Sequence, residues 1–350
     1  MKKSIAAAFA LAAPFAQAQS SVSLSGMVDL YVAHARSGKT SVSKLDEGGG
    51  GASRFVLRGR EDLGGGLEAR FLLEAGFAPD TGLGTLPGPA ISFSRQSFVG
   101  LAGRWGQLDA GRMYTPMFYT LFRADPFGIN SVFSPLNLIA ATDAQPGMTP
   151  FTARASNMVR YRTPANSEFF ADIAYAPGEA ASLSRSSGKM YGGAIGWGRK
   201  PYYIAYAFQK NRAGSAAAPQ ASPAASTFHA LSGSYEFSAL RLYANYVSTA
   251  SSLASVPRAR LVSLGAQYPV TPASNLIVEA MQRKVHGSER SQLGWTLGYD
   301  HFLSKRTAVY ARWLRLNNRH GASASLAGVA VAPNSGDDVR VIAAGIRHSF

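Results

Sequence analysis

The sequence predicts an all-β fold, more specifically a 16-stranded antiparallel transmembrane β-barrel. Three observations predict it. Apolar and polar residues alternate with a period of two along many segments, short turns alternate with longer polar loops between them, and the last segment, Val339 to Phe350, ends on an aromatic residue. Strands of a membrane barrel turn successive side chains to lipid and to the lumen, so this alternation is the pattern expected of them.

A secretory signal peptide is predicted ahead of the strands. Lys2 and Lys3 form a basic region, an apolar stretch follows at 5–15, and Ala16-Gln17-Ala18 (16–18) offers a cleavage site. The alternative, a buried amphipathic helix, does not explain why these features occur in this order. We therefore expect residues 1–18 to be removed and residues 19–350 to form one barrel domain.

The first half of the mature chain contains predicted strands at 21–32, 54–61, 67–77, 93–101 and 107–114. Gly64-Gly65-Gly66 joins the second strand to the third, and Arg104-Trp105-Gly106 joins the fourth to the fifth; such short Gly-containing connections are hairpin signals. The alternation then stops for about forty residues, at 115–155, which is long for a compact connection and indicates a functional loop.

The second half of the chain resumes the alternation, with short turns such as 198–201 and 303–306 between strands. The predicted strands here are 158–163, 169–175, 190–197, 202–209, 228–237, 240–247, 260–270, 276–283, 291–302, 307–316 and 339–350. The longer connections, 177–189, 211–227, 249–257 and 317–337, are rich in Ala, Ser, Gly and Pro and should be solvated. Short turns on one rim and long loops on the other are typical of the periplasmic and extracellular ends of a barrel.

Composition excludes several other classes of protein. After the signal peptide, no apolar run approaches the roughly 18 residues that a membrane helix needs, and the mean hydropathy of −0.03 is close to neutral. The chain has no cysteine, so disulfide and thiolate chemistry are excluded, which fits an oxidising periplasmic route.

The formal net charge of +15 raises the question of nucleic-acid binding. The Arg and Lys residues are dispersed singly through alternating segments, not clustered, and a secreted chain rarely meets nucleic acid. We expect no nucleic-acid partner, and a basic surface or cavity that attracts small anions instead.

The two faces of the predicted strands differ in chemistry. In 54–61, Arg54, Arg58 and Arg60 share one face, while Phe55 and Leu57 share the other. A charged side chain facing lipid costs about 2–4 kcal/mol at the bilayer midplane, so the arginines should point into a water-filled interior. The alternative is a soluble β-sandwich, in which the apolar face would form a core.

Several motifs carry a family resemblance. They are Ser21–Asp29, Arg58–Leu67, Ser94–Leu101, Gly111–Pro116, Leu303–Thr307 and Gly345–Phe350. With them the chain resembles the trimeric general porins of β-proteobacteria and neisseriae, from about residue 20 to its end. Residues 177–260 match only in the alternation of strands, short turns and longer loops. The resemblance implies a homotrimer in the outer membrane of a Gram-negative cell, with a third loop that folds into the pore as a constriction. The long break at 115–155 falls where that loop should be.

The resemblance also implies a set of pore residues. In anion-selective porins a basic ladder lines the constriction, and the matching positions are Arg54, Arg95 and Arg154. Glu74 matches an acid that faces the ladder, and Asp125 is the acid of the loop expected to join it. Three further arginines are expected at the pore, namely Arg58, Arg60 and Arg112. The loop departs from the family pattern in having few acids and many apolar residues, at Met117, Phe118, Tyr119, Leu121 and Phe122.

No pattern supports an enzyme. The six histidines, His34, His229, His286, His301, His320 and His348, have no metal-ligand spacing, and neither a G-x-S-x-G elbow nor a phosphate-binding loop is found. We expect no catalytic residue, no cofactor and no metal.

The sequence thus predicts a water-filled, anion-preferring channel for passive diffusion. Its expected partners are outer-membrane lipids, other copies of the chain, small hydrophilic solutes and inorganic anions. Two alternatives stay open at this point: a substrate-specific channel for anions or carboxylates, and a secreted β-sandwich adhesin.

Overall fold

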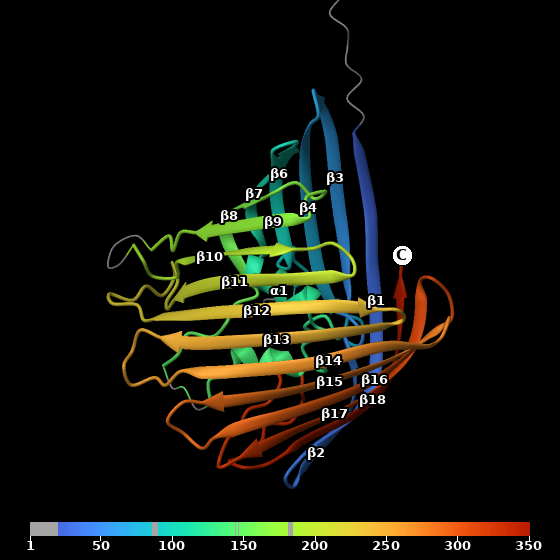
Figure 1. Cartoon of the computed structure of the whole chain (residues 1–350), viewed down its shortest axis with the longest axis vertical. Coiled ribbons are helices and arrows are strands. Elements are labelled where there is room, and N and C mark those ends of the chain that lie inside the picture. Colours follow the sequence, from blue (N-terminus) through green and yellow to red (C-terminus); the bar gives the residue numbers. More distant parts are fainter. Residues whose placement is uncertain (1–19, 86–89, 144, 146, 181–184) are drawn as a thin grey trace, which may run out of the picture.

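The computed structural model describes residues 20–85, 90–143, 145, 147–180 and 185–350. The predicted signal peptide, 1–18, lies outside the described residues. Figure 1 shows the strands wrapped around a common interior, with long loops gathered at one end. The strands are β1 (Ser21–Ser37), β2 (Thr40–Glu47), β3 (Arg54–Gly64), β4 (Leu67–Ala78), β5 (Leu83–Gly84), β6 (Gln96–Gly103), β7 (Gly106–Tyr114), β8 (Arg154–Arg162), β9 (Phe169–Ala176), β10 (Met190–Trp197), β11 (Tyr202–Arg212), β12 (Ala225–Phe237), β13 (Leu240–Ser251), β14 (Ala259–Thr271), β15 (Ser274–Val285), β16 (Ser291–Phe302), β17 (Thr307–Arg319) and β18 (Val339–Ser349).

The barrel is closed by β1. One edge of β1 pairs antiparallel with β18, from Met27 opposite Ser349 to Ser37 opposite Val339. Its other edge is shared, because β3 pairs with residues 21–27 and β2 pairs with residues 30–37. β2 and β3 therefore act as two pieces of one barrel strand, and the two-residue β5 only pairs with the last residues of β4, beyond the part that pairs with β6. This leaves sixteen barrel strands, so the predicted fold class is confirmed.

The first hairpin differs from the sequence prediction. The predicted strand 21–32 continues to Ser37, and β2 was not predicted at all. Its sequence, TSVSKLDE, has only Val42 and Leu45 as apolar residues, too few to register as an alternating strand. Backbone pairing with β1 determines its conformation instead.

The side chains are arranged inside out relative to a soluble protein. On β14, Leu264 is 62% exposed on the outer surface, whereas Ser263 beside it is buried toward the interior. On β18, Ile342 and Ile346 are exposed, as the alternation predicted, and Val341 is buried. One closed sheet with an apolar outer surface excludes the β-sandwich, which needs two sheets packed over a shared core.

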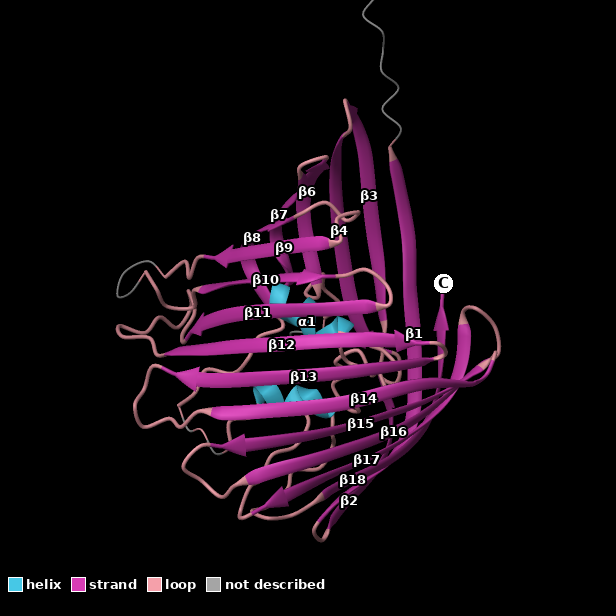
Figure 2. Ribbon diagram, in the orientation of Figure 1, coloured by secondary structure: helices cyan, strands magenta, loops and turns pink. Residues whose placement is uncertain are grey.

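The long connection after β7 lies inside the barrel. It contains α1 (Pro116–Arg123) and a 3₁₀ helix, η1 (Pro135–Ala140). Thr115 caps α1, because its Oγ1 accepts a hydrogen bond from the Phe118 N–H at 3.2 Å. Figure 2 shows the helices behind the strands β10 to β14. Within the described residues, no helix is long and apolar enough to cross a bilayer.

The connection packs against the inner wall through its apolar residues. Met117 and Leu121 of α1 are fully buried in a cluster that includes Ala207 of β11 and Val247 of β13. Further along, wall glycines make room for the loop: a Cβ on Gly265 would lie 2.7 Å from Pro126 Cγ. The same holds for Gly294 and Gly298, which face Pro135 and Phe127 at 2.8 Å.

Gly26 should be essential where the barrel closes. Its N–H and C=O each pair with the backbone of Phe350 at 3.1 Å, and a Cβ there would lie 2.5 Å from the Arg54 carbonyl oxygen and collide with the Phe350 ring. Gly26→Ala should therefore lower the free energy of unfolding by about 1–3 kcal/mol, as overpacking does. Unfolding by guanidinium in detergent measures this. Gly233→Ala is the control, since its one close neighbour is the Tyr203 carbonyl at 3.0 Å. Equal losses in both variants would contradict the closure argument.

Candidate functional site

Five neighbouring barrel strands bring a cluster of charged and aromatic residues to one inner wall, where the long loop leaves and re-enters the sheet. Arg54 begins β3, Glu74 lies on β4, Arg95 directly precedes β6, Tyr114 ends β7 and Arg154 begins β8. The three ladder arginines and Glu74, predicted from sequence, are thus brought together. The antiparallel register explains this, because Val56 pairs with Glu74 and Glu74 pairs with Gln96.

Glu74 is the carboxylate at the centre of this cluster. It accepts hydrogen bonds from Arg95 Nε at 2.8 Å and from Gln96 Nε2 at 2.7 Å, and it lies 3.4 Å from Arg54 Nε. Glu74 and Arg95 are 4% and 8% exposed, so this ion pair is desolvated. One carboxylate therefore serves two arginines.

Tyr114 positions the third arginine. Its hydroxyl oxygen accepts hydrogen bonds from Arg95 Nη2, at 2.7 Å, and from Arg154 Nη2. The Arg154 guanidinium also lies over the Tyr114 ring, 4.1 Å from its centroid, and Phe118 of α1 is stacked on that ring at 4.2 Å. No carboxylate of the described chain is within ion-pair distance of Arg154. Sequence reasoning missed Tyr114; its only signal was membership of the Gly111–Pro116 motif.

The other predicted arginines lie apart from Glu74. Arg112 donates to the Ser94 carbonyl and to Ser156 Oγ, and contacts no carboxylate among the described residues. Arg58 and Arg60 share the inner face of β3 with Arg54 but lie nearer the short-turn end. There Arg58 is exposed, and the exposed Arg60 pairs with Glu68 at 3.7 Å. These residues line the same wall without joining the cluster.

Asp125 does not face the arginines. Its carboxylate accepts hydrogen bonds from the Phe127 and Ile129 N–H groups, at 2.9 and 2.6 Å, and from Ser134 Oγ. It is fully buried against Glu279 of β15, and burial raises the pKa of the Asp125 carboxyl above its usual value. Asp125 was expected to join the arginine ladder, but its carboxylate is instead bound within the turn of the loop that it belongs to.

Asp143, a second acid of the loop, is also engaged away from the cluster. It pairs with Arg283 of β15 at 2.7 Å and accepts a hydrogen bond from Gln292. Of the carboxylates described in the loop, neither Asp125 nor Asp143 therefore contributes charge beside Arg54, Arg95 and Arg154.

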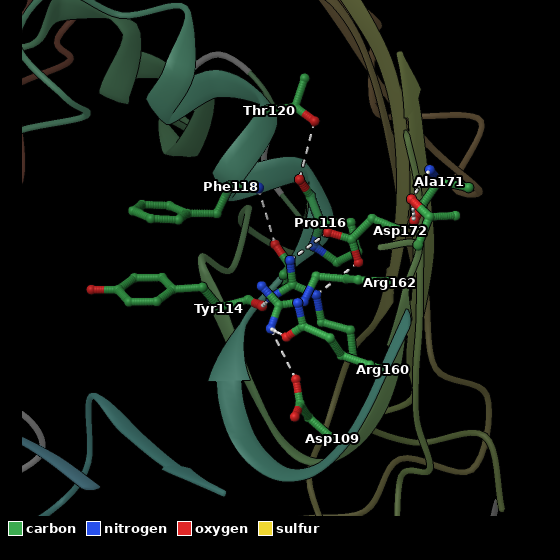
Figure 3. A network of polar contacts seen from close by, with 12 residues as sticks. Asp109, Tyr114, Pro116, Phe118, Thr120, Arg160, Arg162, Ala171 and Asp172 are labelled. Carbon is green, nitrogen blue, oxygen red and sulfur yellow. Dashed lines mark hydrogen bonds and ion pairs between the residues drawn. The ribbon is translucent and has the colours of Figure 1, made fainter. Parts of the chain in front are cut away.

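A second group of ion pairs continues along the wall toward the short turns, and Figure 3 shows it beside the start of α1. Arg160 of β8 binds Asp172 of β9, with Nε to Oδ1 at 2.7 Å, and donates to the Tyr114 carbonyl at 2.9 Å. Arg162 shares Asp109 with Arg70, at 2.9 and 2.8 Å. In the sequence these arginines are isolated residues, and nothing there indicates that Arg160 and Arg162 lie on the same inner wall as Arg154.

The described residues contain no group of three or more His, Asp or Glu side chains that could hold a metal ion. What the site offers is a wall of fixed guanidinium groups, paired with fewer carboxylates, inside a closed barrel. A barrel that is apolar outside and charged inside defines a class of protein: an outer-membrane channel.

Comparison with known proteins identifies the family. The family model of the Gram-negative porins matches residues 5–321. Outer membrane porin protein 32 of Delftia acidovorans is 32% identical, with all of both chains covered. An outer membrane porin protein of Bordetella pertussis is 28% identical, over 89% of this chain and 93% of the relative. An anion-selective porin from Comamonas acidovorans has a similar structure, with a TM-score of 0.85, 28% identity and coverage of 95% and 100% of the two chains.

The chain belongs to the Gram-negative porin family. It is a multi-pass β-barrel of the outer membrane, and the relatives are channels, not enzymes.

Removing the Glu74 charge should destabilise the barrel strongly. Glu74→Gln leaves Arg95 buried without a carboxylate at ion-pair distance, which typically costs about 3–5 kcal/mol. Glu68→Gln is the matched control, because the Arg60–Glu68 pair is long, with Arg60 exposed and Glu68 partly exposed, and should contribute under about 1 kcal/mol. Unfolding by guanidinium in detergent compares the two variants, and a similar small loss in both would show that Arg95 does not depend on Glu74.

Proposed function

We propose that this porin is a passive diffusion channel for ions and small hydrophilic solutes, that it prefers anions, and that Arg54, Arg95 and Arg154 set the preference. The observation that carries the proposal is the imbalance of charge at the inner wall. Among the described residues, Glu74 is the one carboxylate within ion-pair distance of these three arginines; Glu47 of β2 acts on Arg95 only from further away, and the carboxylates described in the loop are bound elsewhere.

Electrostatics supports an anion preference. Arg95 is largely neutralised by Glu74, so Arg54 and Arg154 carry the unbalanced charge, and both are partly exposed to the interior. A low-dielectric wall focuses the field of such charges and raises the local concentration of anions. Salt screens the field over about 8 Å at physiological ionic strength, so the preference should weaken in molar salt.

The loop with α1 is proposed as the element that narrows the pore beside the arginines. Phe118 and Tyr119 of α1 reach the cluster, with ring centroids 4.2 and 5.7 Å from that of Tyr114. Tyr119 also lies under the Arg160 guanidinium at 4.6 Å. The loop would therefore form an aromatic surface that confines solutes near the guanidinium groups. We assign the chain no catalytic role.

Selectivity should depend on the two partly exposed arginines. The double variant Arg54→Ser, Arg154→Ser should shift the zero-current potential in a salt gradient toward cation preference, because Glu74 and Arg95 then balance one another. Planar-bilayer recordings measure this. Arg60→Ser is the control, since Arg60 is on the same face but outside the cluster. An unchanged potential in the double variant, or cation preference in the wild type, would refute the assignment.

We also propose that the protein is a homotrimer. Apolar side chains are exposed on the outer faces of the first and last strands, namely Val22, Leu24, Val99, Leu101, Leu108, Ile342 and Ile346. They can pack against a neighbouring copy instead of lipid. One structure with this fold, OmpT of Vibrio cholerae, was solved in a trimer form, at 14% identity and a TM-score of 0.69.

Light scattering in detergent should give the protein mass of a trimer. Leu24→Glu should release monomers, because a buried unpaired charge opposes the contact. Leu264→Glu is the matched control, since Leu264 of β14 is equally exposed, at 62%, but lies far round the barrel from β1. A monomer mass for the wild type would disprove the proposal.

A further inference from the structure

A pocket of about 250 Å³ lies between α1 and the inner wall of the barrel, near the short-turn end. Its position follows from its lining, which includes Thr163 and Pro164 of the turn between β8 and β9 and Gly198 of the turn between β10 and β11. The short turns mark the end of the barrel that is expected to face the periplasm. The pocket therefore lies on the periplasmic side of the Arg54, Arg95 and Arg154 cluster.

One half of the pocket is aromatic. Phe170 of β9 and Tyr203 of β11 are separated by β10, yet their rings are parallel within 2° and their centroids are 6.1 Å apart. Gly196 of β10 pairs with Phe170, and a Cβ on Gly196 would lie 2.8 Å from Cε1 of the Phe170 ring. The glycine therefore leaves room for that ring to lie over β10. Tyr119 of α1 adds a third aromatic side chain to the lining.

The other half of the pocket is basic, and Arg123 at the end of α1 is its least compensated charge. The Arg123 guanidinium lies 5.7 Å from the centroids of both the Phe170 and the Tyr203 ring, so cation–π contacts hold it in place. The side chain is exposed to the interior, and among the described residues no carboxylate is within ion-pair distance of it. Arg160, which also lines the pocket, is by contrast paired with Asp172.

Arg162 adds a partly compensated charge to the lining. It shares Asp109 with Arg70, at 2.9 and 2.8 Å, so two guanidinium groups meet one carboxylate. Figure 3 shows Arg160 and Arg162 beside the start of α1, with Asp172 on the wall. The pocket thus combines an excess of positive charge with the aromatic faces of Phe170 and Tyr203.

We propose that this pocket binds a small aromatic monocarboxylate, such as benzoate, with its carboxylate on Arg123 and its ring in the aromatic half. The inference rests on the proposed channel function and names a class of solute for it. The fork of a guanidinium group matches a carboxylate, and aromatic side chains pack favourably with a planar ring. The volume suits a ligand with a single ring, because pockets for drug-sized ligands begin at roughly 300 Å³.

A small inorganic anion is a poorer occupant. It would contact Arg123 but leave the apolar faces of Phe170 and Tyr203 without a partner, and it would lose water beside them without compensation. A dianion also fits the charges less well. Of the three arginines that line the pocket, Arg123 is the one without a carboxylate at ion-pair distance in the described chain.

Block of the single-channel current in planar bilayers tests the proposal on the full-length protein. Benzoate should reduce the current at a roughly tenfold lower concentration than acetate, because acetate has the carboxylate but no ring to bury. Benzyl alcohol has the ring without the charge, so it should also be weaker by roughly tenfold. Equal potency of benzoate and either comparison compound would overturn the proposal, because one half of the pocket would then contribute nothing.

Variants then assign the contacts. Arg123→Gln should raise the benzoate concentration for half-maximal block roughly tenfold or more, because hydrogen bonds between charged groups are lost. Arg104→Gln is the matched control, since Arg104 is an exposed arginine in another short turn and does not line the pocket. Equal benzoate potency in these two variants would overturn the assignment of Arg123.

Phe170→Leu provides a second variant that keeps every charge. It should weaken block by benzoate about threefold to tenfold, because an aromatic contact is lost, and it should leave block by acetate unchanged. An equal effect on both anions would contradict the role of the aromatic half.

The zero-current potential of the wild type in a KCl gradient separates this inference from the proposed function. Anion preference without block by benzoate would overturn the pocket alone. Cation preference would count against the proposed selectivity, whereas block by benzoate that depends on Arg123 would still support the pocket.

Discussion

Backbone hydrogen bonding is the constraint on which the rest of this structure depends. In lipid, every strand edge must be paired, because no water can satisfy exposed N–H and C=O groups. β1 meets this requirement by pairing with β18 along one edge and with β2 and β3 along the other. Phe350 extends the closure through its two hydrogen bonds to Gly26. Once the sheet is closed, each side chain must face either lipid or the interior.

The interior is shaped by the long loop more than by the wall. The apolar loop residues Met117, Leu121 and Phe133 are buried against small or apolar residues of the barrel wall. The loop therefore fills one side of the lumen. The opposite side, on β3 to β8, keeps Arg54 and Arg154 partly accessible, although Arg95 and Arg160 are buried there. Because Asp125 and Asp143 anchor the loop to the filled side, they are withdrawn from the pore. The same packing therefore supports both the narrowing and the positive charge that we propose.

The outer surface is also determined by its surroundings. Apolar side chains satisfy the hydrocarbon region, and charged ones are placed at the rims, where headgroups can contact them.

The sequence by itself determined the class of fold, most strand positions and the inward direction of Arg54, since a period of two and the cost of charge in lipid are local properties. Family resemblance added Arg95, Arg154 and Glu74. Sequence could not reveal β2, whose polar residues take strand form only by pairing with β1. Nor could it reveal the role of Tyr114 or the burial of Asp125. Only the tertiary structure decided these, because they depend on cross-strand register and on the path of a loop, which bring together residues as distant as Arg54 and Arg154.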